Sequence, residues 1–432
     1  MISDLALPHQ SGTGTRSSAE AKDYSAASPV LVGVGVVLVG VRIPLPGTNN
    51  LAASGLLLLA LVMWPVIGRW VMMRRENRRL ALLIIAWYFG SVVSNLASDL
   101  SLSRSLLNAL TFPALLAVGA FAVSRLAYGS PSRVGRVLLL VTGGYCCFLM
   151  AFPTSNFRED PWKYGLAIPL TVAVGIVVGW LRQNGLGWLS YVVVSALAVV
   201  HLMLGFRSLA AICLAWMAFL LARRPERTFT LLRTSLFVVA ALAAMWISVV
   251  GYSAAASRGW MGQQELVKYK YQSQVASGYL DAGRPQLLVS AVLIADRPLL
   301  GRGTAVSPSV QERQAVLARL HENGIVGSPS QQVYLFENGL NSHSLALGFW
   351  VRGGILAILP WAYFLAVIYR RVIRRWDPQE AALYPACLFM ALLATWDFLF
   401  SPWSPGYEIL LGIAWSLAVG VERIGDQRLQ GH

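Results

Sequence analysis

The chain is dominated by a series of apolar runs, each long enough to cross the hydrocarbon core of a bilayer, for which a helix needs about 20 residues. Hydrophobic residues make up 56% of the sequence and charged residues only 13%, whereas a soluble protein is about 25% charged. The sequence therefore predicts an all-α integral membrane protein. We expect twelve spans, at approximately residues 29–45, 51–68, 80–97, 105–124, 137–153, 165–181, 188–205, 208–222, 231–251, 344–369, 380–399 and 407–421.

The arginines between these runs predict an orientation. Each dense cluster follows an even-numbered run, and the clustered residues are Arg69, Arg74, Arg75, Arg78, Arg79, Arg125, Arg133, Arg136, Arg182, Arg223, Arg224, Arg227, Arg370, Arg371, Arg374, Arg375, Arg423 and Arg428. Positively charged residues stay in the cytoplasm, so both termini are expected inside and every odd-numbered connection outside. The predicted parts are a cytoplasmic tail, nine helices, an external loop, three helices and a second tail, at residues 1–28, 29–251, 252–343, 344–421 and 422–432.

Composition argues against several other classes. Residues 1–28 lack the basic start and short apolar core of a cleavable signal peptide. The net charge is +15, but its arginines lie between spans rather than on one domain. We therefore expect contacts with membrane lipids and no nucleic-acid partner. The four cysteines lie inside apolar runs and are interpreted as small core residues: Cys146, Cys147, Cys213 and Cys387.

No metal and no cofactor are expected. The sequence has no Gly-rich phosphate loop, no Asp-x-Asp pair and no His, Cys and carboxylate cluster that offers three or four metal ligands. Any catalysis would then depend on arginine and histidine.

The long polar stretch at 252–343 interrupts the apolar pattern. It follows the ninth run, so it is expected outside, and its eight basic residues are nearly balanced by six acidic ones. Its patterning predicts short helices over 263–276, 284–295 and 308–321. We expect this stretch to form a loop that covers the bundle and carries the chemistry.

Three residues at this outer surface are candidates for function. Arg207 lies in the tight turn between the seventh and eighth runs, Arg284 opens the second loop helix, and His343 ends the loop. Each also has an ordinary interpretation: a snorkelling arginine, a solvated charge beside a helix, and an interfacial histidine. The predicted topology nevertheless places all three on one side. Arginine makes planar, bidentate contacts with phosphate, and a neutral histidine accepts a proton from a hydroxyl. Together they suit metal-free glycosyl transfer from a polyprenyl diphosphate.

Three short motifs resemble the O-antigen ligase and polymerase superfamily of the bacterial envelope. Phe206-Arg207-Ser208-Leu209-Ala210 is similar to the family's Ser-Arg-Gly-small turn, although Phe206 replaces the usual Ser. Gly283-Arg284, followed by Arg297-Pro298-Leu299-Leu300-Gly301-Arg302-Gly303, resembles its "Arg, helix, Pro-Leu-Leu-Gly-x-Gly" segment. Asn341-Ser342-His343-Ser344-Leu345, with Gly353-Gly354-Ile355-Leu356, resembles its entry into the next helix. The resemblance covers about residues 190–370, and residues 1–180 match only in hydropathy.

The resemblance implies a GT-C-like glycosyltransferase of about twelve transmembrane helices in the bacterial inner membrane, with a periplasmic active site. The donor would be undecaprenyl-diphosphate-linked O-antigen and the acceptor a hydroxyl of lipid A–core. Arg207 and Arg284 would contact the diphosphate, and His343 would act as base. Ser344, where polymerases often have Asn, favours a ligase. A polymerase of the same superfamily and a lipid-linked oligosaccharide transporter are the alternatives.

Two further arginines are candidates for substrate binding. Arg352 lies about two and a half turns beyond His343, and a charge at that depth suggests either a water-lined donor cavity or an ion pair. Asp397 and Glu408 are its candidate partners. Arg302 would either reach phosphate or cap the loop.

Overall fold

The structure is a computed structural model of the chain. It describes residues 27–44, 52–153, 155–222, 239, 246, 250–251, 253–273, 285–304, 308–322, 342–374, 376–404 and 406–421. Within these residues the chain is mostly helical, and its one sheet is a hairpin of β1 (Arg42–Pro44) and β2 (Ala52–Ser54).

Six helical segments among the described residues are long and apolar enough to cross a membrane. They contain α5 (Arg75–Leu96), α6 to α7 (Leu102–Ala127), α8 (Pro131–Ala151), η3 with α10 (Trp162–Gln183), η4 with α20 (Ile355–Ile373) and η5 with α21 (Ala381–Phe400). Four further apolar helices in the described part of the chain are shorter: α2 (Pro29–Val39), α11 (Gly187–Met203), α12 (Arg207–Ala222) and α22 (Tyr407–Val419).

The predicted count of twelve spans is not confirmed, because several expected runs are interrupted. The run at 51–68 is two short helices, α3 (Leu56–Val62) and α4 (Trp64–Met73), which meet where Pro65 fits the first turn of a new helix. The run at 344–369 divides at Gly354, whose φ of 64° is incompatible with a continuous helix. It forms α19 (Leu345–Gly353) before α20 (Leu359–Ile373). The run at 231–251 lies almost wholly outside the described residues.

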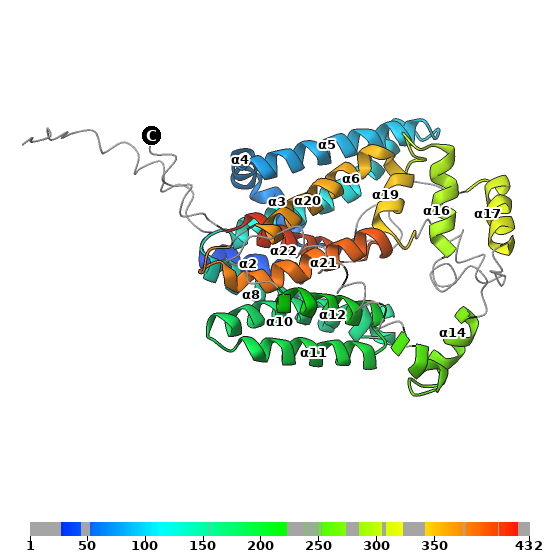
Figure 1. The fold of residues 1–432 in the computed structure, drawn as a ribbon. Coiled ribbons are helices and arrows are strands. Elements are labelled where there is room, and N and C mark those ends of the chain that lie inside the picture. The colour runs from blue at the N-terminus through cyan, green and yellow to red at the C-terminus, as the bar shows by residue number, and fades with distance from the viewer. Residues whose placement is uncertain are drawn as a thin grey trace, which may run out of the picture.

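α21 and α22 form the centre of the bundle and are buried along most of their length. Figure 1 shows them between the layer of α5 and α20 and the layer of α10, α11 and α12. An aromatic cluster joins α5, α19 and α20: the Phe349 ring stacks on Trp361 with ring centroids 5.1 Å apart and meets Trp87 at 4.8 Å. This packing holds α19 on the bundle despite the break at Gly354.

Large apolar side chains also point outward along the helices, Leu82, Trp188 and Val199 among them. Soluble proteins rarely expose apolar surface of this extent, whereas lipid accommodates it. The outward-facing apolar residues and the six long helices together indicate a membrane protein.

The bundle has two chemically different ends. The arginine-rich end contains Arg75 at the start of α5, Arg371 near the end of α20 and Glu380 before α21. At the opposite end, here called the loop end, lie Asn95 of α5 and Phe398 of α21. α5 has 22 residues, so the two ends are about 33 Å apart at 1.5 Å per residue.

Beyond the loop end lie α14 (Gln263–Ser273), α16 (Pro285–Asp296) and α17 (Val310–Glu322), as Figure 1 shows. Their bounds confirm the short helices predicted inside the polar stretch. α16 packs against both α17 and α19 through a separate apolar cluster of Val289, Leu293, Val316, Leu320 and Val351.

Candidate functional site

His343 lies at the loop end, immediately before α19, in a turn that two serines hold. Ser344 caps α19: its hydroxyl accepts from the backbone N–H of Leu347 at 3.2 Å and donates to the carbonyl of Phe398 at 3.2 Å. The Ser342 hydroxyl donates to the Ser344 carbonyl at 2.6 Å. These bonds fix the backbone on both sides of His343 and tie it to the end of α21.

The backbone of His343 is itself unusual. Its φ is 45°, a left-handed conformation that residues other than glycine rarely adopt. Such conformations gather at functional sites because the surrounding structure must hold them in place. The backbone of the half-buried His343 is thus held in one conformation at the start of a helix.

Arg207 begins α12 at the same end of the bundle. The preceding turn is closed by a hydrogen bond from the N–H of Phe206 to the carbonyl of His201 at 2.8 Å, and Gly205 supplies the positive φ of 76° that the turn requires. α21 packs against α12 on one side and against α19 on the other. The structure therefore brings Arg207 and His343 to two helices that flank the same end of α21.

Arg284 lies outside the described residues. The described chain resumes at the next residue, Pro285, which begins α16, and α16 packs directly on α19. Close to this start, Gln286 is buried, and its side-chain oxygen has no hydrogen-bond partner. An unsatisfied buried amide is uncommon in proteins and marks a candidate ligand contact that the sequence did not indicate.

The segment 297–304 joins α16 to the bundle through hydrogen bonds. The N–H of Ile355 donates to the carbonyl of Leu299 at 3.1 Å, the N–H of Arg302 donates to the carbonyl of Val351 at 2.6 Å, and the side chain of Trp350 donates to the carbonyl of Pro298 at 2.6 Å. The segment thereby satisfies backbone groups that the break between α19 and α20 leaves open.

Asn95 of α5 secures the other end of this segment. Its side-chain oxygen accepts from the backbone N–H of Thr304 at 2.6 Å and from the Thr304 hydroxyl at 3.0 Å. The hydroxyl of Ser98 donates to the carbonyl of Arg302 at 2.7 Å. The Pro-Leu-Leu-Gly-x-Gly pattern thus has a structural role in this chain: it closes the loop helices onto α5 and α19.

Arg302 is engaged in ion pairs. Its guanidinium contacts the carboxylate of Asp296 at 2.7 Å and also that of Glu312 on α17. The Arg302 and Glu312 side chains are only 18% and 17% exposed, so these charges largely compensate one another. These contacts favour the structural alternative for Arg302, and substrate binding by it stays a prediction.

Arg352 lies near the aromatic cluster of the bundle. Its guanidinium carbon is 4.7 Å from the centre of the Phe112 ring, a cation–π distance. Of its two candidate partners, Asp397 is hydrogen-bonded to Ser401 and Tyr407, and Glu408 is buried at the start of α22. Pairing of Arg352 with either carboxylate, and its place in a donor cavity, remain predictions.

His201 is a buried residue at the loop end that sequence reasoning missed. Trp162 donates to its Nδ1 at 3.1 Å, so Nε2 carries the proton and donates to the hydroxyl of Thr171 at 3.0 Å. The Thr171 hydroxyl donates in turn to the carbonyl of Ala167. Both ring nitrogens of the neutral imidazole are satisfied, so His201 fixes the end of α11 beside the Arg207 turn rather than acting as a base.

Among the described residues, no group of three or more His, Cys, Asp or Glu side chains is arranged to hold a metal ion. Fold and site together define a polytopic helical membrane protein with a polar, helix-capped region at one end. No family model matches the chain, and no curated protein resembles it at a significant level.

Proposed function

We propose that this chain is a membrane glycosyltransferase of the O-antigen ligase type in the bacterial inner membrane. It would transfer polysaccharide from undecaprenyl diphosphate to a sugar hydroxyl of lipid A–core at the periplasmic face. The observation that carries the proposal is that each candidate residue accompanies the beginning of a helix. α12 begins at Arg207, α16 begins one residue after Arg284, and α19 begins two residues after His343.

Helix beginnings suit a diphosphate. The first backbone N–H groups of a helix lack partners within the helix, and the aligned peptide dipoles place a partial positive charge there. An arginine at the same place adds a permanent charge and bidentate hydrogen bonds. The starts of α12 and α16 would hold the donor diphosphate through Arg207 and Arg284 and would neutralise the charge that develops as it leaves. Gln286, the buried second residue of α16, would add an amide to this binding surface.

His343 would act on the acceptor. In the proposed step the acceptor oxygen bonds to the anomeric carbon, and the bond from that carbon to the diphosphate oxygen breaks. The imidazole takes the hydroxyl proton, and undecaprenyl diphosphate leaves. Such proton transfer contributes typically 10²–10⁴-fold to a rate. The left-handed backbone at His343 and the hydrogen bonds of Ser342 and Ser344, which fix the turn, support this role.

The direct test is reconstitution of the purified full chain with carrier-linked glycan and lipid A–core, scored for the joined product. His343→Ala should abolish the product, while His321→Ala, which removes an exposed histidine of α17, should leave it unchanged. Activity should persist in a chelator, because guanidinium groups supply the charge compensation. Full activity of His343→Ala would remove His343 as the base.

The same assay separates the alternatives. A polymerase would lengthen the carrier-linked glycan and leave lipid A–core unmodified. A transporter would form neither product and would instead move carrier-linked glycan across the vesicle membrane. Either result would refute the ligase proposal.

A further inference from the structure

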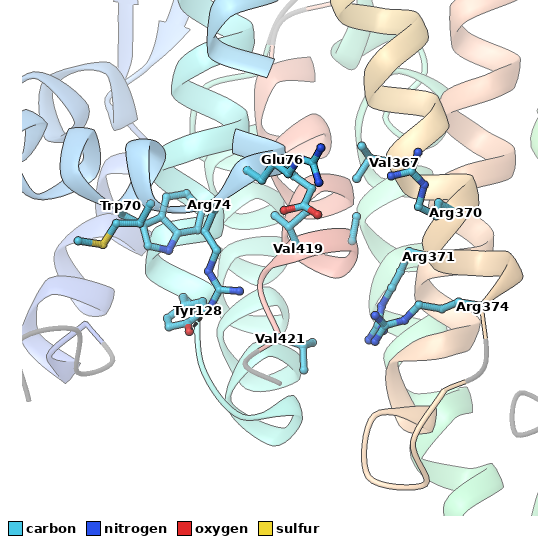
Figure 2. A pocket seen from close by; sticks show the side chains of 13 residues that line it. Trp70, Arg74, Glu76, Tyr128, Val367, Arg370, Arg371, Arg374, Val419 and Val421 are labelled. Carbon is cyan, nitrogen blue, oxygen red and sulfur yellow. Dashed lines mark hydrogen bonds between the residues drawn. The ribbon is translucent and has the colours of Figure 1, made fainter. Parts of the chain in front are cut away.

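A cavity of about 570 Å³ opens at the arginine-rich end of the bundle, at the other end from the proposed catalytic residues. It lies between the junction of α4 and α5, the end of α20 and the end of α22 (Figure 2). Five arginines line it: Arg74, Arg75, Arg370, Arg371 and Arg374. Its volume is typical of small-molecule sites, which range over about 300–1,000 Å³.

The charge of the cavity is strongly unbalanced. Among the described residues that line it, Glu76 is the one acidic residue, and Glu380 pairs with two of the arginines from outside the lining. Glu380 accepts from Arg371 at 2.7 Å and from Arg374 at 3.1 Å. One carboxylate shared by two guanidinium groups leaves an excess of positive charge facing the cavity.

Three of the arginines, Arg74, Arg371 and Arg374, are held in place before any ligand binds. On the α20 side, the guanidinium carbon of Arg371 lies 3.6 Å from the centre of the Trp376 ring. Figure 2 shows the Arg371 and Arg374 guanidinium groups side by side and directed into the cavity. On the opposite wall, Arg74 donates to the Tyr128 hydroxyl and lies 4.9 Å from the centre of that ring. A pre-positioned pair of cationic walls loses little conformational entropy when an anion binds between them.

Arg371 gives a second reason to expect a bound anion in the cavity. Its side chain is only 4% exposed, and its Nε has no hydrogen-bond partner. A buried donor of a charged group that lacks an acceptor is costly, so it suggests an acceptor that the protein alone does not supply. Guanidinium forks match phosphate oxygens in geometry and charge.

The surroundings of the cavity favour a lipid over a soluble anion. Its walls include the apolar side chains of Val367, Val419 and Val421. α4, which lines one edge through Trp70 and Met73, exposes the apolar side chain of Met72, and Figure 1 shows this helix crosswise to α5. A crosswise helix with exposed apolar side chains beside arginines is typical of the boundary between headgroups and acyl chains.

We propose that this cavity binds the phosphodiester headgroup of an anionic phospholipid from the leaflet at the arginine-rich end. The predicted orientation makes this the cytoplasmic leaflet. The phosphate would lie between Arg74 on one wall and Arg370, Arg371 and Arg374 on the other, and the acyl chains would leave along α4. A bound lipid would bridge α4 and α20 and stabilise the bundle. The site is independent of the proposed transferase activity.

Native mass spectrometry of the full chain in detergent tests the proposal, with phosphatidylglycerol as the probe and phosphatidylcholine as the zwitterionic comparison. The test variant is Arg74→Gln/Arg370→Gln, which removes one charge from each wall and leaves the buried Arg371 in place. The matched control is Arg136→Gln, an exposed arginine of α8 outside the cavity.

Wild type and Arg136→Gln should retain one phosphatidylglycerol in preference to phosphatidylcholine. The double variant should bind it at least about tenfold more weakly, as expected from the loss of charge-assisted bonds. Inorganic phosphate in excess should not displace the lipid. Equal retention by the double variant, equal retention of phosphatidylcholine, or displacement by inorganic phosphate would each overturn the proposal.

A second variant distinguishes a loss of lipid binding from a folding defect. Arg370 is exposed, so Arg370→Gln alone should leave the circular dichroism of the protein unchanged. The single variant should still weaken phosphatidylglycerol retention, and Arg370→Lys should fall between it and wild type because a lysine keeps the charge without the bidentate geometry. Retention by Arg370→Gln equal to that of wild type would likewise count against the site.

Discussion

Replacing Gly301 with alanine tests whether the 297–304 segment packs closely against the junction of α19 and α20. Gly301 has φ of 71°, and an added Cβ would lie 2.6 Å from the nitrogen of Gly354, 2.7 Å from the carbonyl oxygen of Val351 and 2.8 Å from that of Trp350. All three are backbone atoms, so no side-chain rotation relieves the overlap. The segment must instead move away from the junction of α19 and α20.

The expected cost has two parts. An alanine in the left-handed region costs about 1–2 kcal/mol. Forcing extra volume into a packed interior costs about 1–3 kcal/mol. Gly301→Ala should therefore lower the free energy of unfolding by about 2–5 kcal/mol.

Two glycines provide matched controls. Gly185 has a similar φ of 78° but no heavy atom within 4 Å of its added Cβ, so Gly185→Ala should show the conformational cost of about 1–2 kcal/mol alone. Gly143, inside α8, has open space around it and no positive φ. Gly143→Ala should be neutral or stabilising by about 0.5–1 kcal/mol, because alanine favours a helix interior.

The assay is equilibrium unfolding of each purified variant in mixed micelles by titration with sodium dodecyl sulfate, followed by circular dichroism. The reasoning predicts a clear order: Gly143→Ala is the most stable, Gly185→Ala is intermediate, and Gly301→Ala is the least stable. If Gly301→Ala and Gly185→Ala lose the same stability, the close approach of the segment to α19 is refuted and only the backbone conformation matters. Transfer activity should also fall in Gly301→Ala, because the segment holds α16 against α19.

Three other predictions concern single side chains. Arg302→Ala and Glu312→Ala, combined in a double-mutant cycle under the same unfolding titration, should show a coupling energy of about 0.5–3 kcal/mol. Arg302→Ala should leave the KM for the carrier-linked donor unchanged. Additive effects on stability together with a raised KM would instead support substrate binding by Arg302. His201→Phe keeps a ring of similar size but leaves the Trp162 indole N–H without its acceptor and removes the donor to the Thr171 hydroxyl. It should therefore lower the free energy of unfolding by about 1–3 kcal/mol, and a stability equal to wild type would contradict the assigned hydrogen bonds. Arg284→Lys should reduce transfer about tenfold or more with unchanged unfolding, because an ammonium does not reproduce bidentate phosphate contact; unchanged transfer would argue against that contact.

Much of the local structure could be predicted from the sequence. The helices expected at 263–276, 284–295 and 308–321 appear as α14, α16 and α17, because their apolar spacing and flanking breakers act over a few residues. The apolar runs that the structure describes appear wholly or partly as helices for the same reason. The interruptions were missed, because a glycine at the centre of an apolar run does not reveal whether it continues a helix, as Gly348 does, or ends one, as Gly354 does.

The candidate site was predictable only in part. The order of the spans was enough to expect Arg207 and His343 at one end of the bundle, since the chain reverses direction at each connection between two spans. The roles of the individual charged residues could not be predicted from the sequence. Nothing in the spacing of Arg302 indicated that Asp296 and Glu312 would engage it, and nothing near His201 in the sequence indicated Trp162 and Thr171, which are 39 and 30 residues away.

The sequence by itself determined that this chain belongs in a membrane and that its dense arginine clusters belong at one end of the bundle. Both follow from forces that act on each residue singly: hydrocarbon excludes unpaired backbone polar groups, and long apolar runs separate the charged connections. Only the tertiary structure decided what each charge does. Arg302 is paired with Asp296 and Glu312, whereas Arg74, Arg75, Arg370, Arg371 and Arg374 line a cavity in which Glu76 is the one acidic residue among the described lining residues. Whether a guanidinium meets a carboxylate or an open cavity depends on which distant segments pack together, and an ion pair forms only between groups that packing brings within a few ångströms.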